Sequence, residues 1–295
     1  MDDSALKSDL EKLRQEINLH NYRYHVLDSP LISDYEYDQL MARLREFESA
    51  HPEWITPDSP TQRTGGVVMD KFVKVRHPRS ILSLANAFDL DGVRAWFERI
   101  ARLDERVLTT NFVVEPKIDG LTVVLHYENG LFVGGATRGD GEIGEDITTN
   151  LCTVRAVPLR IPVHPDGPVP PPHLVVRSEA FITLKDFEEL NQRLEKKGQK
   201  PYLNPRNTAA GSLRQLDSNL TATRPLTILT YAIVSSDGLI PVTQWDTLQY
   251  LRNLGFPVSD IVEYCPTIDA VLESCEKWNE RRDRLTFEVD GAVIK

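Results

Sequence analysis

The chain of 295 residues is 41% hydrophobic and 26% charged, which excludes disordered and fibrous proteins, and it has no run of 18 apolar residues that could span a membrane. Its acidic N-terminus lacks the apolar core of a secretory signal, and its three cysteines include no Cys-x-x-Cys pair, so we expect a cytoplasmic protein without disulfides or structural zinc. The net charge of −10 predicts that this chain by itself binds DNA weakly.

Two amphipathic helices are predicted at the N-terminus. Leucine and isoleucine residues recur at helical spacing within residues 4–27, and Pro30 ends this pattern because the residue before a proline avoids the helical conformation. Ser33 and Glu36 have the spacing of a capping box, which places the start of a second helix at about Asp34. The two segments therefore form a helical hairpin.

A linker is predicted at residues 56–66, a polar stretch that contains Pro and Gly. We therefore divide the chain into a helical subdomain over residues 1–69 and a larger domain over residues 70–295. The acidity lies mainly in the first part, because residues 1–70 hold 7 Lys and Arg against 14 Asp and Glu.

From about residue 110 the hydrophobic pattern becomes that of strands. The segments with strand character are 111–115, 121–127, 131–137, 174–182, 226–234 and 287–295. The segments with helical character are 184–198, 244–254 and 268–281. Residues 158–172 hold seven prolines and are expected to form an extended surface connection. Because strands and helices mix without a regular βαβ alternation, we predict an α+β fold with an antiparallel sheet.

One short motif, Glu115-Pro116-Lys117-Ile118-Asp119-Gly120, lies between two predicted strands. Such a motif alone is most often a loop with an Asp-Gly turn and a solvated lysine. The alternative is a lysine nucleophile held between the carboxylates of Glu115 and Asp119. A lysine attacks only as the free amine, which at neutral pH requires desolvation or neighbouring cations. The motif therefore needs support from other residues.

Further charged residues stand where charge is unusual. Arg138 follows a predicted strand within a glycine-rich turn, and Glu179 lies inside an apolar strand, where an unpaired charge is costly. Glu179 fits either a buried salt bridge or an acceptor for ribose hydroxyls. Arg206 and Arg214 lie in a Gly- and Ala-rich stretch, where their guanidinium groups either bind phosphates bidentately or are simply exposed.

The last predicted strand carries two carboxylates, Glu288 and Asp290, and one lysine, Lys295. A period of two places Lys295 on the same face as Val289 and on the face opposite Glu288 and Asp290.

In chain order these motifs resemble the nucleotidyltransferase motifs of polynucleotide ligases: Lys-x-Asp-Gly, Arg-Gly-Asp-Gly, a strand glutamate, a two-arginine stretch and Asp-Gly-x-x-x-Lys. TRGDGEIGEDIT and NPRNTAAGSLRQLD resemble the NAD-dependent bacterial DNA ligases in particular. The N-terminal hairpin is similar to the helical module of that branch through Tyr24, His25, Asp34, Tyr37 and Asp38. Without the resemblance, Asp34, Tyr37 and Asp38 would be an acid at a helix start, a core tyrosine and a solvated acid. The chain departs from the family pattern at three positions, Pro116, Ser178 and Glu288, none of which removes a reactive group.

The resemblance implies a helical hairpin followed by an ATP-grasp-like nucleotidyltransferase domain with antiparallel sheets, truncated at its C-terminus. It also implies the first step of ligation, in which Lys117 attacks the α-phosphate of NAD, releases nicotinamide mononucleotide (NMN) and keeps AMP. The hairpin residues Tyr24, His25, Asp34, Tyr37 and Asp38 would bind the NMN half. The residues implied for the AMP half are Ser83, Leu84, Glu115, Ile118, Arg138, Glu179, Tyr231 and Lys295. Among these, Glu115 would read the adenine edge, Tyr231 would stack on the base, and Glu179 would accept from the ribose. Arg206 and Arg214 would bind phosphates of nicked DNA or of AMP.

The resemblance also implies parts that this sequence does not contain. The last lysine motif, an oligonucleotide-binding fold, a cysteine-rich zinc module, a helix-hairpin-helix region and a terminal partner-binding domain are expected beyond Lys295. Zinc is expected only in that part. Magnesium is expected through phosphate oxygens and water, without protein metal ligands. We expect a monomer that seals nicks in duplex DNA during replication and repair when the enzyme is full-length.

Two other functions fit the same fold. A non-catalytic NAD-binding scaffold is disfavoured by the intact Lys117. An ATP- or GTP-using RNA ligase or capping enzyme is disfavoured by the N-terminal hairpin, because nothing in ATP needs an aromatic and acidic site for nicotinamide.

Overall fold

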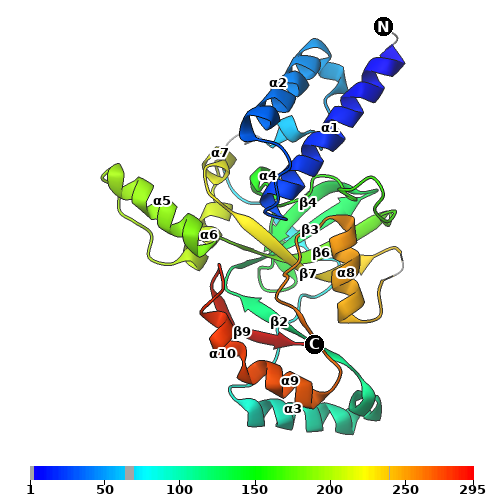
Figure 1. Cartoon of the computed structure of the whole chain (residues 1–295), viewed down its shortest axis with the longest axis vertical. Helices are drawn as coiled ribbons and strands as arrows, with labels where there is room; N and C mark the ends of the chain where they lie inside the picture. The colour runs from blue at the N-terminus through cyan, green and yellow to red at the C-terminus, as the bar shows by residue number, and fades with distance from the viewer. Residues whose placement is uncertain (1–2, 64–69, 239) are drawn as a thin grey trace.

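The computed structural model describes residues 3–63, 70–238 and 240–295. Figure 1 shows a helical hairpin at one end, a four-stranded sheet in the middle and a smaller sheet with helices at the other end. Every strand pair within the described ranges is antiparallel, which confirms the predicted α+β class. No helix in this part of the chain is both long enough and apolar enough to cross a membrane.

The N-terminal hairpin consists of α1 (Asp3–His25) and α2 (Asp34–Ala50). The two helices bury one apolar cluster between them: Leu10, Leu13, Ile17, Met41 and Leu44. The predicted capping box is present at the start of α2, where the Ser33 hydroxyl accepts from the Glu36 amide and the Glu36 carboxylate accepts from the Ser33 amide. Local sequence signals therefore account for this hairpin.

The segment after α2 is docked on the larger domain. It contains two short 3-10 turns, η1 (Pro52–Trp54) and η2 (Pro60–Gln62). Arg160 Nε donates to Asp58 Oδ2 over 2.6 Å, and Arg63 donates to three backbone carbonyls of the larger domain over 2.9, 3.1 and 3.5 Å. The predicted linker 56–66 is thus held in place up to Arg63, and its residues 64–66 lie outside the described residues.

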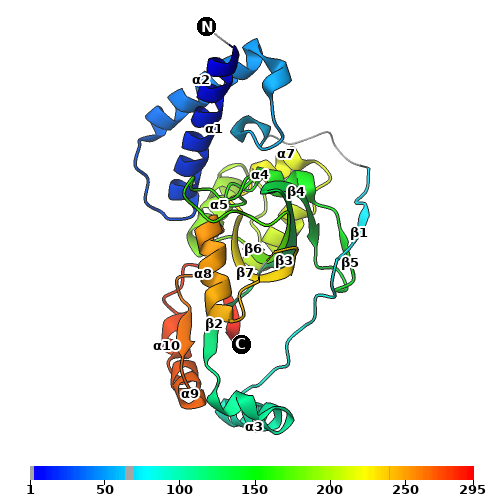
Figure 2. The same ribbon diagram turned by 90° about the vertical axis from the view of Figure 1, so that its right-hand side faces the viewer.

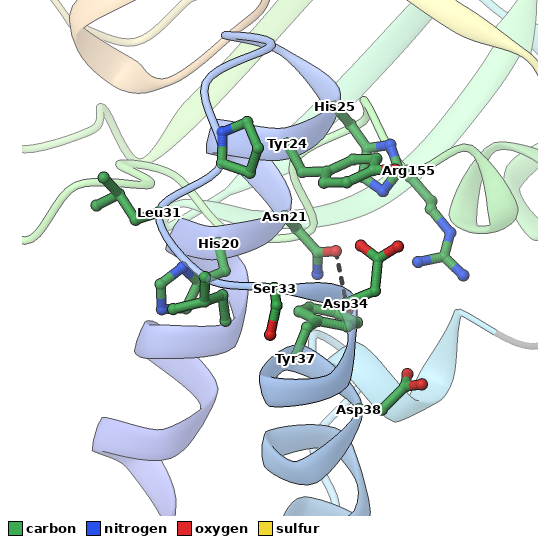
Figure 3. A pocket seen from close by; sticks show the side chains of 12 residues that line it. His20, Asn21, Tyr24, His25, Leu31, Ser33, Asp34, Tyr37, Asp38 and Arg155 are labelled. Carbon is green, nitrogen blue, oxygen red and sulfur yellow. Dashed lines mark hydrogen bonds between the residues drawn. The ribbon is translucent and has the colours of Figure 1, made fainter.

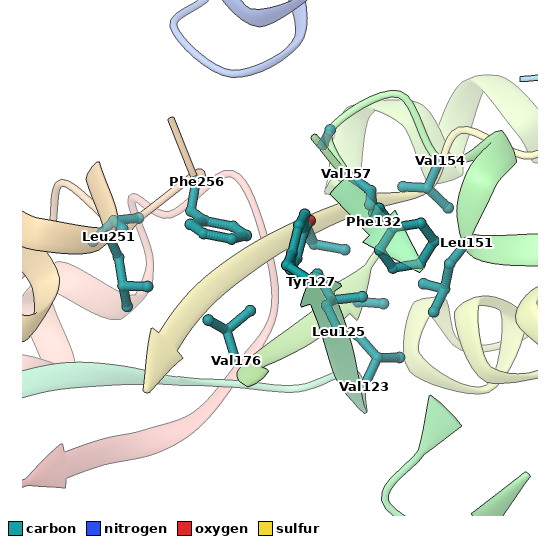
Figure 4. Close-up of a cluster of buried hydrophobic side chains, with 14 of the residues drawn as sticks. Val123, Leu125, Tyr127, Phe132, Leu151, Val154, Val157, Val176, Leu251 and Phe256 are labelled. Atoms are coloured by element: carbon teal, nitrogen blue, oxygen red, sulfur yellow. The ribbon is translucent and has the colours of Figure 1, made fainter. Parts of the chain in front are cut away.

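The four-stranded sheet carries the main hydrophobic core. In spatial order its strands are β4 (Leu131–Thr137), β3 (Leu121–Glu128), β6 (His173–Phe181) and β7 (Thr227–Ser236). Alternate residues of β3 point to the core, as the period of two in a strand requires. Figure 4 shows Leu125 and Tyr127 beside Phe256, which follows α8 (Gln244–Leu254). This core fixes the four strands relative to one another.

A three-stranded sheet lies beyond it, away from the hairpin (Figures 1 and 2). Its order is β8 (Glu263–Cys265), β2 (Phe112–Ile118) and β9 (Val289–Ile294). Two helices pack on it, α3 (Leu90–Leu103) and α9 (Ile268–Glu276), through a cluster that includes Phe112 and Val271. A separate pair of short strands joins β1 (Lys74–Arg76) to β5 (Ile143–Glu145).

The remaining elements are short or project from the sheets. They are η3 (Glu105–Thr109), α4 (Thr148–Thr153), α5 (Leu184–Lys196), α6 (Pro205–Leu213), α7 (Ser218–Ala222) and α10 (Trp278–Arg282). The predicted helix 268–281 is interrupted at Lys277, which separates α9 from α10. The proline-rich residues 158–172 contain no helix, and their only strand-like contact within the described chain is an isolated bridge at Arg160.

Candidate active site

Lys117 lies in strand β2 at an irregularity of the sheet. The strand continues through Pro116 and Lys117, so the predicted strand-to-strand loop is wrong at these positions. The register between β2 and β9 shifts here, and two residues of β9, Asp290 and Gly291, stand opposite the single residue Lys117. Gly291 has a φ of +136°, a conformation that suits glycine. The next residue, Ile118, packs against a buried apolar cluster.

This bulge changes which β9 side chains face Lys117. Strict alternation predicts that Asp290 and Lys295 lie on opposite faces, and the structure contradicts this. The Asp290 carboxylate accepts a hydrogen bond from Lys117, while Lys295 Nζ lies 3.0 Å from Glu115 Oε1. Lys117 and Glu115 are two residues apart on β2 and share a face. The extra residue of the bulge therefore brings both β9 side chains to the same face.

The carboxylate beside Lys117 is not one of those predicted. Glu115 and Asp119 were expected to flank the lysine, but Glu115 pairs with Lys295, and Asp119 Oδ1 lies 3.3 Å from Arg206 Nε. Asp290 takes their place, and the hydrogen bond from Lys117 lowers the pKa of the Asp290 carboxyl. The Lys117 side chain is 44% exposed, so a substrate can reach it from solvent.

Glu115 is the centre of a buried polar cluster and is 5% exposed. Besides Lys295, its Oε1 accepts from Gln244 Nε2 over 2.7 Å. The same amide nitrogen donates to the backbone carbonyl of Tyr231 over 2.8 Å, and Lys295 Nζ donates to that carbonyl over 3.3 Å. Burial lowers the pKa of Lys295, and the Glu115 carboxylate opposes this shift. The sequence analysis did not identify Gln244.

Glu179 lies on β6 beside the start of β3. Its Oε2 accepts from Thr122 Oγ1 over 2.9 Å and from the Tyr231 hydroxyl over 3.3 Å. Burial raises the pKa of Glu179 to about 7 and also raises the pKa of Tyr231. A Cβ at Gly120 would lie 2.4 Å from the carbonyl oxygen of Ala180. The glycine of the Lys-x-Asp-Gly motif therefore allows β3 to begin in direct contact with β6.

The predicted phosphate-binding arginines lie in different surroundings. Arg138 is held by its backbone, since its amide donates to the carbonyl of Thr122 over 3.1 Å. The two-arginine stretch forms helix α6, with Arg206 in its first turn and Arg214 at its C-terminal cap. Arg206 pairs with Asp119, two residues from Lys117, and therefore lies near the lysine. Arg214 Nε is 2.7 Å from Glu145 Oε2 instead.

Ser83 and Leu84 belong to the exposed segment between β1 and α3. The carbonyl of the preceding residue, Leu82, accepts from Arg177 over 3.3 Å. The Arg177 guanidinium lies 5.4 Å from the centre of the Tyr231 ring. The segment thus reaches the cluster around Glu115 and Glu179 through Arg177, which the sequence analysis did not identify.

A second polar site lies where the hairpin meets the larger domain. It is a cavity of about 300 Å³. The hairpin residues predicted to bind NMN all line it: Tyr24, His25, Asp34, Tyr37 and Asp38. Figure 3 shows Asp34 and Asp38 along one side of α2, as their spacing of four residues requires. The larger domain contributes Arg155 to the same cavity.

The cavity contains residues that the sequence analysis missed. The Tyr37 hydroxyl donates to Asn21 Oδ1 over 2.9 Å, and Asn21 is buried. Asn21 follows Ile17 by four residues on the apolar stripe of α1, and a polar residue on such a stripe was the available signal. Burial, together with the positive charges of Arg155 and Arg63, lowers the pKa of His25 to about 4. His25 is therefore neutral at neutral pH.

The two sites are separate in this structure. None of the residues that line the cavity belongs to the cluster around Lys117. Figures 1 and 2 show the hairpin at one end of the molecule and strands β2 and β9 on the other side of the four-stranded sheet.

Two family models match the chain in succession. The one described as DNA ligase-like, N-terminal NAD+-binding domain matches residues 3–65. The one described as NAD-dependent DNA ligase adenylation domain matches residues 69–295.

Curated relatives match over nearly the whole chain. The DNA ligase of Roseiflexus castenholzii is 51% identical over 294 residues, which cover 97% of this chain and 41% of that protein. The DNA ligase of Chloroflexus aggregans is 50% identical and that of Heliobacterium modesticaldum 49% identical, with 97% of this chain covered in each comparison. These matches cover 43% and 41% of the two relatives, so the chain spans about two fifths of the length of these proteins.

Proposed function

The chain belongs to the family of NAD-dependent DNA ligase adenylation domains, and from this premise we propose that it transfers AMP from NAD to its own Lys117. The observation that carries the proposal is the bulge between β2 and β9. It presents Lys117 half exposed, next to Asp290, with Glu115 on the same face of the sheet.

The proposed reaction is a phosphoryl transfer. The free amine of Lys117 attacks the α-phosphorus of NAD, an N–P bond forms, and the bond from phosphorus to the bridging oxygen of the diphosphate breaks. NMN leaves with that oxygen, the amine loses its proton, and AMP remains as a phosphoramidate. The pair between Lys117 and Asp290 must open first, because an ammonium group hydrogen-bonded to a carboxylate cannot attack.

The AMP half of NAD fits the groups that surround Lys117. We assign Glu115 to the adenine edge, Tyr231 to the base, and Glu179 to ribose hydroxyls that would replace its present donors. Ser83 and Leu84 close the same site through the contact of their segment with Arg177. We also assign Ile118 to this site, as the residue that follows the nucleophile.

Fixed cations would stabilise the charge that develops on the phosphoryl oxygens. We assign this role to Arg138 and Lys295. Arg206 joins them because it already pairs with Asp119, two residues from Lys117. Arg214 is bound to Glu145 and is the arginine best suited to a DNA phosphate, once that pair opens.

The NMN half is assigned to the cavity of the hairpin. Tyr24 and Tyr37 provide aromatic surface, Asp34 and Asp38 accept hydrogen bonds from the ribose and the amide, and a neutral His25 donates or accepts without adding charge. Since the cavity and Lys117 are separate here, we infer that the hairpin changes its position on the larger domain and approaches Lys117 when NAD binds. The division into residues 1–69 and 70–295 is the corresponding proposal for the domains.

Magnesium would reach the reaction through NAD phosphate oxygens and water. Within the described residues, no group of three or more His, Cys, Asp and Glu side chains is placed to hold a metal ion. No residue of this chain is therefore assigned to the metal. Zinc belongs to no site proposed in this chain.

The family supports a proposal for the activity of the whole protein. We propose that the full-length enzyme is a cytoplasmic monomer that seals nicks in duplex DNA during replication and repair. With a net charge of −10, the chain by itself would hold nicked DNA weakly at physiological salt.

Intact-protein mass spectrometry tests the proposal. The chain is incubated with NAD and magnesium, or with ATP and magnesium, and the fraction carrying one AMP is measured. We expect the adduct with NAD and not with ATP. An adduct with ATP alone would favour the RNA ligase or capping enzyme, and the absence of any adduct in a chain that binds NAD would favour the scaffold.

A further inference from the structure

Gln244 connects two residues of the AMP site that lie far apart in the sequence. It is the first residue of α8, whose N-terminal cap is Thr243. Its Nε2 donates to the buried Glu115 carboxylate over 2.7 Å and to the Tyr231 backbone carbonyl over 2.8 Å. The helix start fixes the backbone of Gln244, and its side chain bridges Glu115 and Tyr231 from that position.

The orientation of the Gln244 amide follows from its neighbours. A carboxylate and a backbone carbonyl are both acceptors, so only the NH2 end of the amide can face them, and it uses one hydrogen for each. The bond to Glu115 is charge-assisted and therefore stronger than a bond between neutral groups.

Both donors to Glu115 use the same oxygen. Gln244 Nε2 and Lys295 Nζ lie 2.7 and 3.0 Å from Oε1. None of the hydrogen bonds or ion pairs found in the described part of the chain uses Oε2. Two donors on one oxygen hold the carboxylate in one orientation and leave the other oxygen available as an acceptor.

We propose that Gln244 is a positioning residue that determines base preference in the adenylation reaction. It holds Glu115 as an acceptor for the exocyclic amine of adenine and holds the Tyr231 ring against the same base. Hypoxanthine carries a carbonyl in place of that amine, and its oxygen would face the fixed carboxylate oxygen without a proton between them. The site therefore rejects it, because an acceptor that faces an acceptor is left unpaired.

The inference rests on the proposed adenylation, and the test separates the two. The rate of AMP adduct formation is measured over a range of concentrations of NAD and of its hypoxanthine analogue. The chain is compared with Gln244→Met, which keeps the side-chain volume and removes the donor. Gln249→Met is the matched control, because it makes the same change on the same helix away from Glu115.

For Gln244→Met we expect the half-saturating NAD concentration to rise about tenfold, the size typical of one lost hydrogen bond to a charged group. We expect the rate at saturation to change less than about threefold, since the residue is remote from phosphorus. The preference for NAD over the hypoxanthine analogue should fall at least about fivefold. Gln249→Met should keep all three values of the unmodified chain.

A second variant keeps the test decisive if Gln244→Met folds poorly. Gln244→Glu keeps the length of the side chain and sets an acceptor against Glu115, so it should lose more NAD affinity than Gln244→Met. Equal losses for both dinucleotides, with the preference unchanged, would show that Gln244 is only structural and would overturn the inference. If the unmodified chain forms no adduct with NAD, the proposed function itself fails.

Discussion

The hairpin cavity and the cluster around Lys117 hold their charged groups in opposite ways. In the cavity, Asp34 and Asp38 are exposed and have no partner among the described residues. In the cluster, each reactive group is bound to another side chain: Lys117 to Asp290, and Glu115 to Lys295.

This difference determines what each site must do to bind its half of a dinucleotide. A ligand that enters the cavity only displaces water from groups that are already available. A ligand that enters the cluster must open the pair between Lys117 and Asp290 and replace the donors to Glu179, so the bonds it gains are offset by those it breaks. The cavity is therefore suited to recognition, and the cluster is suited to chemistry that starts only when a substrate opens its ion pairs.

The largest effect is expected from a substitution that removes the nucleophile of the cluster. Lys117→Ala should reduce AMP adduct formation with NAD by at least about 1,000-fold, because no other group replaces the lost nucleophile. The measurement is intact mass followed by peptide mapping. Lys185→Ala, which removes an exposed lysine of α5, is the control and should retain the adduct. An adduct that survives Lys117→Ala on another lysine would show that the nucleophile is assigned wrongly.

The next largest effect is expected from a substitution in the cavity that leaves the cluster intact. Asp38→Ala should slow adenylation at subsaturating NAD by about 10- to 150-fold, the range for one lost charged hydrogen bond. The reverse reaction of the lysyl-AMP form with NMN should slow equally. Transfer of AMP to nicked DNA by a full-length enzyme should not change, because that step uses no NMN.

The control for this prediction is Glu46→Ala, which removes an exposed carboxylate of the same helix outside the cavity. Its adenylation rate should equal that of the unmodified chain. If Asp38→Ala behaved like Glu46→Ala, the hairpin would be structural only. Equal losses in the NAD and DNA steps would instead indicate misfolding.

How far the sequence predicts each region follows from the range of its interactions. The capping box and the apolar stripe of the hairpin are patterns within a single helix, so the sequence predicts them directly, whereas the contact of Asn21 with Tyr37 joins two helices and was not predicted. The cluster joins β2, β6, β7 and β9. Motif order suggested its members, but not the partners of Lys117, because a single extra residue at Gly291 reverses the alternation of β9.

A third prediction uses the opposite titration of the two regions. Burial raises the pKa of Glu179 to about 7, so between pH 4.5 and 7 the folded chain holds a proton that the unfolded chain has lost, and stability falls as pH rises. Burial lowers the pKa of His25 to about 4, so between pH 4 and 6.5 the unfolded chain holds the additional proton, and stability rises with pH. Each slope is at most about 1.4 kcal/mol per pH unit, and the two oppose each other.

Urea unfolding from pH 4.5 to 6.5 measures both slopes by removing one group at a time. The slope of the free energy of unfolding against pH should be more positive for Glu179→Gln than for the unmodified chain. It should be more negative for His25→Gln. Identical slopes in all three proteins would mean that neither group is buried as described.

The smallest effect on the reaction rate concerns the anchor between the two regions. Arg160 Nε contacts Asp58 Oδ2 at 2.6 Å, and Asp58 is buried while the Arg160 side chain is 40% exposed. Arg160→Met should lower the free energy of unfolding by about 2 to 3 kcal/mol, because it leaves the buried Asp58 carboxylate without its partner. If the hairpin moves to bring NMN to Lys117, loosening this contact leaves the hairpin residues that line the cavity unchanged. The rate with saturating NAD should then stay within about threefold of the unmodified chain, far from the loss expected for Asp38→Ala.

A loss as large as that of Asp38→Ala, without unfolding, would show that the docked segment sets the geometry of the reaction. The cavity and the cluster would then form one site rather than two that meet.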